Sequence, residues 1–139
     1  MNENNTYSVS LQKIYFSNAI KILSLFKEGT VFKLTGADEI HSDFISGGPF
    51  LLIFNNRGRI YGKFLIITDK EIIMEWNVEG FNKPNEIMTT VEITLQDQAE
   101  NCVLTLNHKY ILNEGAAMAK QRAWMEILNE VEKMLAGKS

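Results

Sequence analysis

The chain has 139 residues, of which 45% are hydrophobic and 22% charged, a composition typical of a single globular domain. Its 14 Lys and Arg residues against 17 Asp and Glu residues give a net charge of −3, which argues against nucleic-acid binding through overall positive charge. Cys102 is the only cysteine, so we expect neither a disulfide nor a zinc site built from paired cysteines. Because Met1–Ser8 is polar and no run approaches the ~18 apolar residues of a membrane helix, we expect one cytoplasmic, soluble domain over residues 1–139.

The first 36 residues predict a strand followed by a short helix. Residues 7–14 alternate between apolar and polar side chains, which is typical of a half-buried strand. Ser17 is expected to cap a helix over residues 19–26, where apolar residues recur at helical spacing, and Gly29 is expected to end it. Residues 30–36 are compatible with a second short helix or with an extended connector.

A run of short strands follows between residues 39 and 110. The expected strands cover residues 39–46, 49–54, 59–68, 71–78, 87–96 and 101–110. Turn-forming residues separate several of them, and connections this short imply antiparallel neighbours. Alternation predicts an inner face that consists of Ile60, Gly62, Phe64, Ile66, Ile72, Met74, Trp76, Ile87, Val91, Ile93, Leu95, Cys102, Leu104, Leu106 and His108.

The last segment, residues 115–136, predicts a long helix that covers this face. Its apolar stripe consists of Ala117, Trp124, Leu128, Val131 and Leu135, and charged residues including Lys120 are expected off the stripe. About 22 residues at about 1.5 Å each give roughly 33 Å, enough to cross a curved sheet. The order of elements predicts an α+β fold.

Several segments resemble one known family. They are Gly47-Gly48 before Pro49-Phe50, Gly62-Lys63-Phe64, Ile72–Trp76, Leu104–His108, and Trp124 with Leu128. In this order and spacing they resemble the activator of heat-shock protein 90 ATPase family, in its single-domain bacterial form, within the START-like (SRPBCC) superfamily. Residues 30–34 depart from the family, which usually has a proline-containing turn and a Trp-Phe pair there.

The resemblance implies a helix-grip fold. In this fold a curved antiparallel sheet of about six or seven strands wraps around a long C-terminal helix, with one or two short helices after the first strand. Superfamily members hold small hydrophobic molecules in a cavity between sheet and helix. On the residues and the resemblance together, the hypothetical cavity residues are Phe50, Phe64, Met74, Trp76, His108, Trp124 and Leu128. The alternative is that these side chains simply fill the core.

Candidate catalytic chemistry is sparse in the sequence. His41 and Asp43 share one strand face, but two such residues without a third partner are more typical of a solvated face than of acid–base catalysis. Cys102 is expected to be a small buried hydrophobe, and Tyr61 or Tyr110 are candidates to join His108 as polar groups of a cavity. We expect no catalytic residue, no metal and no cofactor.

Three functions follow from this interpretation. The first is a non-enzymatic domain that binds a small hydrophobic ligand in the cavity. The alternative is a co-chaperone-like interaction module whose partner is a chaperone, which Phe81 projecting from the loop over residues 79–85 would favour. A cyclase- or hydrolase-like enzyme is the third and would need convergent polar residues inside the cavity. Nucleic acid is not an expected partner, and no segment that spans a membrane is expected.

Overall fold

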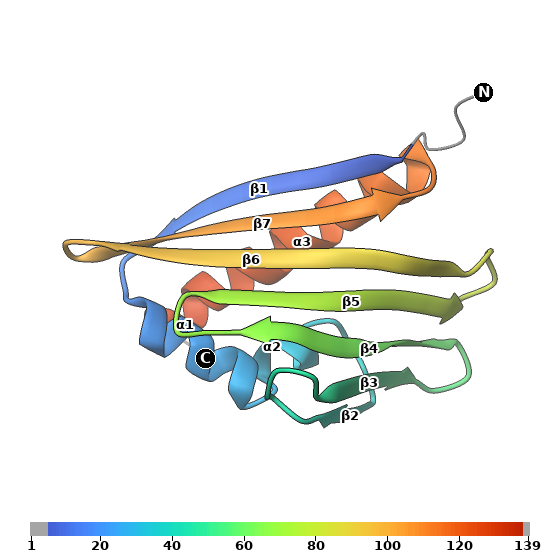
Figure 1. Ribbon diagram of the computed structural model, residues 1–139, viewed down its shortest axis with the longest axis horizontal. Helices are drawn as coiled ribbons and strands as arrows, with labels where there is room; N and C mark the ends of the chain where they lie inside the picture. The colour runs from blue at the N-terminus through green and yellow to red at the C-terminus, as the bar shows by residue number, and fades with distance from the viewer. Residues whose placement is uncertain (1–5, 138–139) are drawn as a thin grey trace.

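The computed structural model describes residues 6–137, which form a seven-stranded antiparallel sheet, two short helices and one long helix (Figure 1). The elements are β1 (Tyr7–Tyr15), α1 (Ala19–Lys27), α2 (Thr30–Lys33), β2 (Glu39–Ser42), β3 (Pro49–Phe54), β4 (Gly58–Ile67), β5 (Glu71–Gly80), β6 (Glu86–Gln98), β7 (Asn101–Ile111) and α3 (Glu114–Leu135). The strand order is β1-β7-β6-β5-β4-β3-β2, so the first strand pairs with the last one. The predicted α+β helix-grip fold is confirmed.

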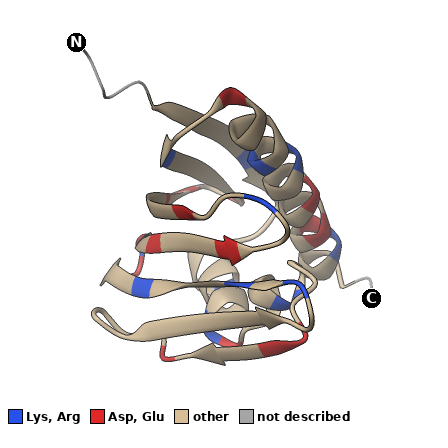
Figure 2. Cartoon of the chain, turned by 90° about the vertical axis from the view of Figure 1, so that its right-hand side faces the viewer, with Lys and Arg blue, Asp and Glu red and all other residues tan. Residues whose placement is uncertain are grey.

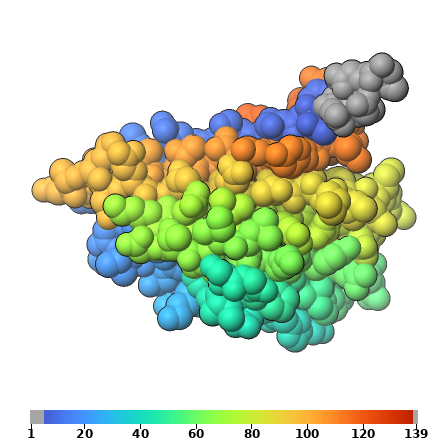
Figure 3. Space-filling view, in the orientation of Figure 1, coloured from blue at the N-terminus to red at the C-terminus, as the bar shows by residue number. Residues whose placement is uncertain are grey.

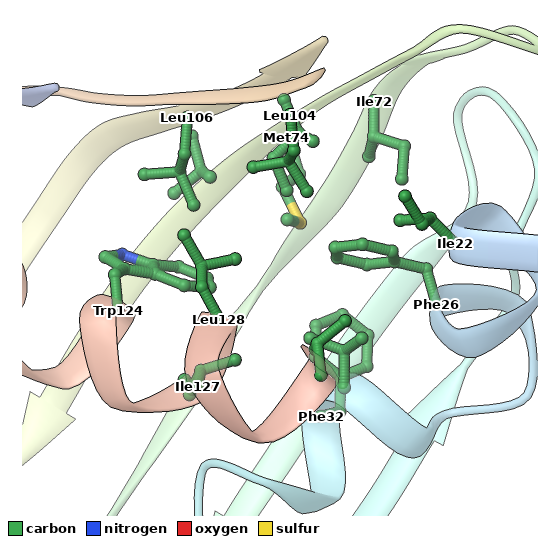
Figure 4. Packing of buried hydrophobic residues seen from close by; sticks show 14 of the residues in the cluster. Ile22, Phe26, Phe32, Ile72, Met74, Leu104, Leu106, Trp124, Ile127 and Leu128 are labelled. Atoms are coloured by element: carbon green, nitrogen blue, oxygen red, sulfur yellow. The ribbon is translucent and has the colours of Figure 1, made fainter. Parts of the chain in front are cut away.

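The long helix α3 covers the concave face of the curved sheet (Figure 2). It begins after Asn113, whose side chain accepts a hydrogen bond from the backbone of Ala116. Trp124 and Leu128 project from α3 toward the sheet and meet Leu106 there (Figure 4). On the other side, the strands form most of the surface that faces the viewer in Figure 3. Within residues 6–137, no helix is long and apolar enough to cross a membrane.

The segment after β1 forms two helices. Asn18, not the predicted Ser17, caps α1, because the Asn18 side chain is the one that accepts from the backbone N–H of Lys21. Gly29 follows the end of α1 as predicted, with a φ of 82° that suits glycine. Residues 30–36, for which two conformations were open, contain the single helical turn α2, which buries Phe32.

Backbone irregularities overturn two of the inner-face predictions. The pairing of β4 with β5 shifts between Phe64 and Ile66, and as a result Ile66 is exposed and Ile67 packs against the core instead. A second shift, near the start of β6, coincides with a left-handed φ of 66° at Met88. Ile87 is therefore exposed and Glu86 lies inside. A prediction from strict alternation contains no bulges. One extra residue in a strand moves all residues beyond it to the opposite face, so the prediction fails there.

Candidate functional site

A cavity of about 560 Å³ lies between α3, the inner face of β3 to β5 and the residues that follow α2. Its apolar lining consists of Leu34, Phe54, Ile60, Trp76, Val78, Phe81, Ala119, Ala123, Trp124 and Ile127. Its polar lining consists of Thr35, Arg57, Lys83, Lys120, Glu126 and Glu130. A mostly apolar cavity with a few polar groups at one side is typical of sites for small molecules.

Two aromatic pairs shape the cavity wall. The ring centroids of Trp76 and Trp124 lie 5.2 Å apart, which joins β5 to α3. Phe81 and Phe54 form an edge-to-face pair, also at 5.2 Å. Phe81 is half-buried and lines the cavity, so it does not project from the loop as a co-chaperone surface would require. The loop after β5 thus closes onto the cavity.

The structure divides the seven hypothetical cavity residues into two groups. Trp76 and Trp124 line the cavity. The other five, Phe50, Phe64, Met74, His108 and Leu128, are buried in the core and do not line it. Phe32 of α2 explains part of this division, because its ring stacks on Phe50 at 5.2 Å and on Phe64 at 6.3 Å and occupies that part of the interior.

His108 lies behind the two tryptophans in a chain of hydrogen bonds. Trp124 Nε1 donates to His108 Nδ1 at 3.1 Å, His108 Nε2 donates to Thr89 Oγ1 at 3.0 Å, and the Thr89 hydroxyl donates to the Trp76 carbonyl. An indole N–H can only donate, so Nδ1 must be unprotonated. Burial and, secondarily, the charge of Lys120 lower the pKa of His108 to about 3. His108 is therefore neutral, and this chain binds β5, β6, β7 and α3 together.

A buried ion pair lies at one end of the cavity. Lys120 and Glu86 are each 8% exposed, and the Lys120 ammonium contacts Glu86 Oε1. Lys83 Nζ lies 3.2 Å from Glu86 Oε2. Burial lowers the pKa of Lys120, and the partner Glu86 offsets this in part. For Glu86 burial alone raises the pKa, but the two lysines outweigh it and the net pKa lies below its usual range.

Sequence reasoning missed this cluster. Lys120 was expected off the apolar stripe, and that prediction was wrong. The sequence does contain a signal for the burial of Lys120. Lys120 lies four positions before Trp124, and residues at i and i+4 share one face of a helix. The bulge near Met88 hid Glu86, since it brings this residue to the inner face in place of Ile87.

The remaining polar candidates lie away from the cavity. His41 Nε2 lies 3.2 Å from the Glu39 carboxylate on an exposed surface, so its partner is Glu39 and not Asp43. The Tyr61 hydroxyl donates to Glu79 at 2.6 Å, and Tyr110 is half exposed; neither lines the cavity. Cys102 is fully buried. In the part of the chain that the structure describes, no three His, Cys, Asp or Glu residues are placed to hold a metal ion.

Comparison with known proteins identifies the family. The model of the family described as "Activator of Hsp90 ATPase homolog 1-like protein" matches residues 26–136. The chain belongs to this family. The match includes the cavity lining as well as α3 up to its last residue. No curated protein matches the sequence significantly.

Several solved structures share the helix-grip fold of this chain. PFC0360w, an HSP90 activator from Plasmodium falciparum, has a TM-score of 0.73 at 23% identity, over 93% of this chain and 96% of that one. The Aha1 dimer from Colwellia psychrerythraea has a TM-score of 0.73 at 18% identity, over 91% and 94%. CalU16 from Micromonospora echinospora has a TM-score of 0.69 at 18% identity, over 89% and 73%. Identities this low establish the fold alone.

Proposed function

We propose that this domain binds a small, mainly apolar molecule in the cavity between α3 and the sheet. The observation that carries the proposal is the cavity itself, about 560 Å³ in volume, with both tryptophans of the chain in its wall. Sites for small molecules commonly span about 300–1,000 Å³ and are mostly apolar. Burial of apolar ligand surface would supply the binding free energy, at about 25 cal/mol per Å² before ordering costs.

The proposed role is binding without catalysis. His108, the buried group best suited to move a proton, does not line the cavity, and Trp124 and Thr89 engage its two ring nitrogens. The titratable groups that do line the cavity are Arg57, Lys83, Lys120, Glu126 and Glu130. Lys120 is held in an ion pair with Glu86, which supports a role in placing charge rather than in proton transfer.

Intrinsic fluorescence tests this proposal directly, because Trp76 and Trp124 are the only two tryptophans and both line the cavity. Titration with 1-alkanols of increasing length should change the emission, and the affinity should rise with each added methylene until the cavity is full. Ala123→Phe, which adds a ring at an exposed position in the cavity lining, should abolish binding. Gln121→Phe is the matched control on the same helix, because Gln121 does not line the cavity. Equal binding by wild type and Ala123→Phe would contradict the proposal.

A co-chaperone role is the second candidate. The family match supports it, as does the fold shared with the Plasmodium falciparum HSP90 activator. Phe16 and Ile20 are 80% and 73% exposed where β1 passes into α1, and exposed apolar side chains of this size favour a protein contact.

An ATPase assay separates the two roles. If the second candidate holds, the purified chain should raise the ATPase rate of a heat-shock protein 90 from the same organism, and Ala123→Phe should leave that effect intact. Phe16→Ser with Ile20→Ser should reduce it. An unchanged ATPase rate at saturating protein would remove this candidate.

A further inference from the structure

One end of the cavity carries an excess of positive charge. Lys83 and Lys120 both line the cavity, and both contact the carboxylate of Glu86. Glu86 itself is not part of the lining, and only about a tenth of its side chain is exposed. The cavity therefore meets two ammonium groups at this end, and the one carboxylate that they share lies behind them.

Acidic residues lie at the other end of the lining. Glu126 and Glu130 follow Lys120 by six and ten positions, which correspond to about 9 Å and 15 Å along α3. Both are exposed, and Glu130 pairs with Lys133 at 3.0 Å. Water and salt screen exposed charges strongly, whereas Lys120 is 8% exposed and is screened much less. A bound ligand would therefore interact more strongly with the positive charge at this end than with the exposed carboxylates at the other.

The positive charge lies directly beside the apolar wall. Lys120 and Trp124 are one helical turn apart on the same face of α3, and Lys83 is two positions from Phe81 in the loop that closes the cavity. A ligand in contact with the aromatic rings therefore reaches the ammonium groups without leaving the cavity.

We infer that the ligand is an amphipathic carboxylate, with an apolar body against Trp76 and Trp124 and its anionic head between Lys83 and Lys120. This inference rests on the proposed binding function and adds the chemical class of the ligand. The two ammonium groups offer one donor to each carboxylate oxygen, and the Glu86 carboxylate favours the charged form of Lys120 in its buried position.

A matched pair of probes tests the charge of the head group. Decanoate and 1-decanol have the same chain length, and at pH 7 only decanoate is charged. Titrated against wild-type protein and followed by tryptophan fluorescence, decanoate should bind about tenfold more tightly, the scale of one charge-assisted hydrogen bond. Added salt should weaken decanoate binding and leave decanol binding unchanged.

Charge variants locate the head group. Lys120→Met should lower the affinity for decanoate about tenfold. Lys83→Gln should lower it about threefold, because Lys83 is more exposed. Both changes should weaken decanol binding much less than decanoate binding, because decanol carries no charge. Arg122→Gln is the control, since Arg122 is exposed on the same helix and does not line the cavity.

The outcomes distinguish this inference from the proposed function. A preference for decanoate that disappears in Lys120→Met and Lys83→Gln supports both. Equal binding of the two probes, or tighter binding of decanol, overturns the carboxylate inference and leaves the apolar binding function standing. Binding of neither probe overturns both. If Lys120→Met lowers the affinity for decanol as much as the affinity for decanoate, Lys120 has only a structural role, and the inference is also overturned.

Discussion

The interior beneath the sheet has two regions that are built from the same kind of side chain but packed differently. Beside α2, the rings of Phe32, Phe50 and Phe64 lie 5.2–6.3 Å apart and fill the space. Beside α3, Trp76 and Trp124 pair equally closely, at 5.2 Å, yet a cavity of about 560 Å³ remains in front of them. Aromatic content alone therefore does not decide whether a helix-grip interior is filled.

The covering helices account for the difference. The single turn of α2 inserts the fully buried Phe32 into the filled region. Opposite Trp76, α3 presents the small residues Ala119 and Ala123 to the cavity, and these leave volume open. The two regions meet where Phe50 lies 5.8 Å from Trp76. We expect the filled region to determine stability and the open region to determine binding.

The largest expected effect is that of Phe64→Ala in the filled region. Phe64 is fully buried and contacts the rings of Phe32, Phe44 and Phe50, so its removal leaves a cavity that rigid neighbours cannot close. We expect the free energy of unfolding to fall by about 3–5 kcal/mol in urea titrations. A loss below about 1 kcal/mol would mean that the filled region is loosely packed, and the comparison would fail.

The next effect concerns the hydrogen-bonded chain behind the two tryptophans and depends on pH. The pKa of His108 is lowered to about 3 in the folded protein by burial and by Lys120, against 6.5 for a free histidine. Between these values the unfolded state binds the extra proton. The stabilising contribution is thus fully present above about pH 6.5 and is lost as the pH falls toward 3. At pH 5 we expect a loss of about 2 kcal/mol relative to pH 7, measured by urea unfolding.

His108→Gln is the matched comparison for this pH effect. A glutamine amide can accept from Trp124 Nε1 and donate to Thr89 Oγ1, but it does not titrate. The variant should lose about 2 kcal/mol less than wild type between pH 7 and pH 5. Parallel pH profiles for wild type and His108→Gln would show that His108 does not titrate as described.

The sequence predicted the fold well because the fold depends on patterns that extend over many residues. Apolar alternation and short turns located β3 to β7, and helical spacing located α3, each within a few residues of the observed ends. The local errors have local causes. The shifts at Ile66 and Ile87 each follow from a bulge, and the cap at Asn18 instead of Ser17 depends on which of two adjacent polar side chains turns back.

The candidate site was harder to predict because a cavity is the space that remains after the side chains of several packed elements have filled the interior. Residue types along α3 and β5 identified Trp76 and Trp124 as interior residues, but they could not show that Phe32 fills the space beside Phe50. Nor could they pair Lys120 with Glu86, which are 34 positions apart and meet only once β6 and α3 are packed. Sequence periodicity reports which face of an element is buried, and not what the opposite element contributes.

The smallest effect on stability is expected from Phe81→Ala in the open region, and it sharpens the comparison most. Phe81 is half-buried and its main aromatic contact is Phe54, so we expect a loss of about 1 kcal/mol or less in the free energy of unfolding. The same change uncovers one side of the cavity and should weaken 1-decanol binding several-fold, as read from tryptophan fluorescence, because the bound chain would then contact water. Phe81→Leu, which keeps an apolar cover, should retain most of the affinity. A stability loss of about 3 kcal/mol or more would instead make Phe81 a core residue, and the interior would then have one continuous packed region rather than two.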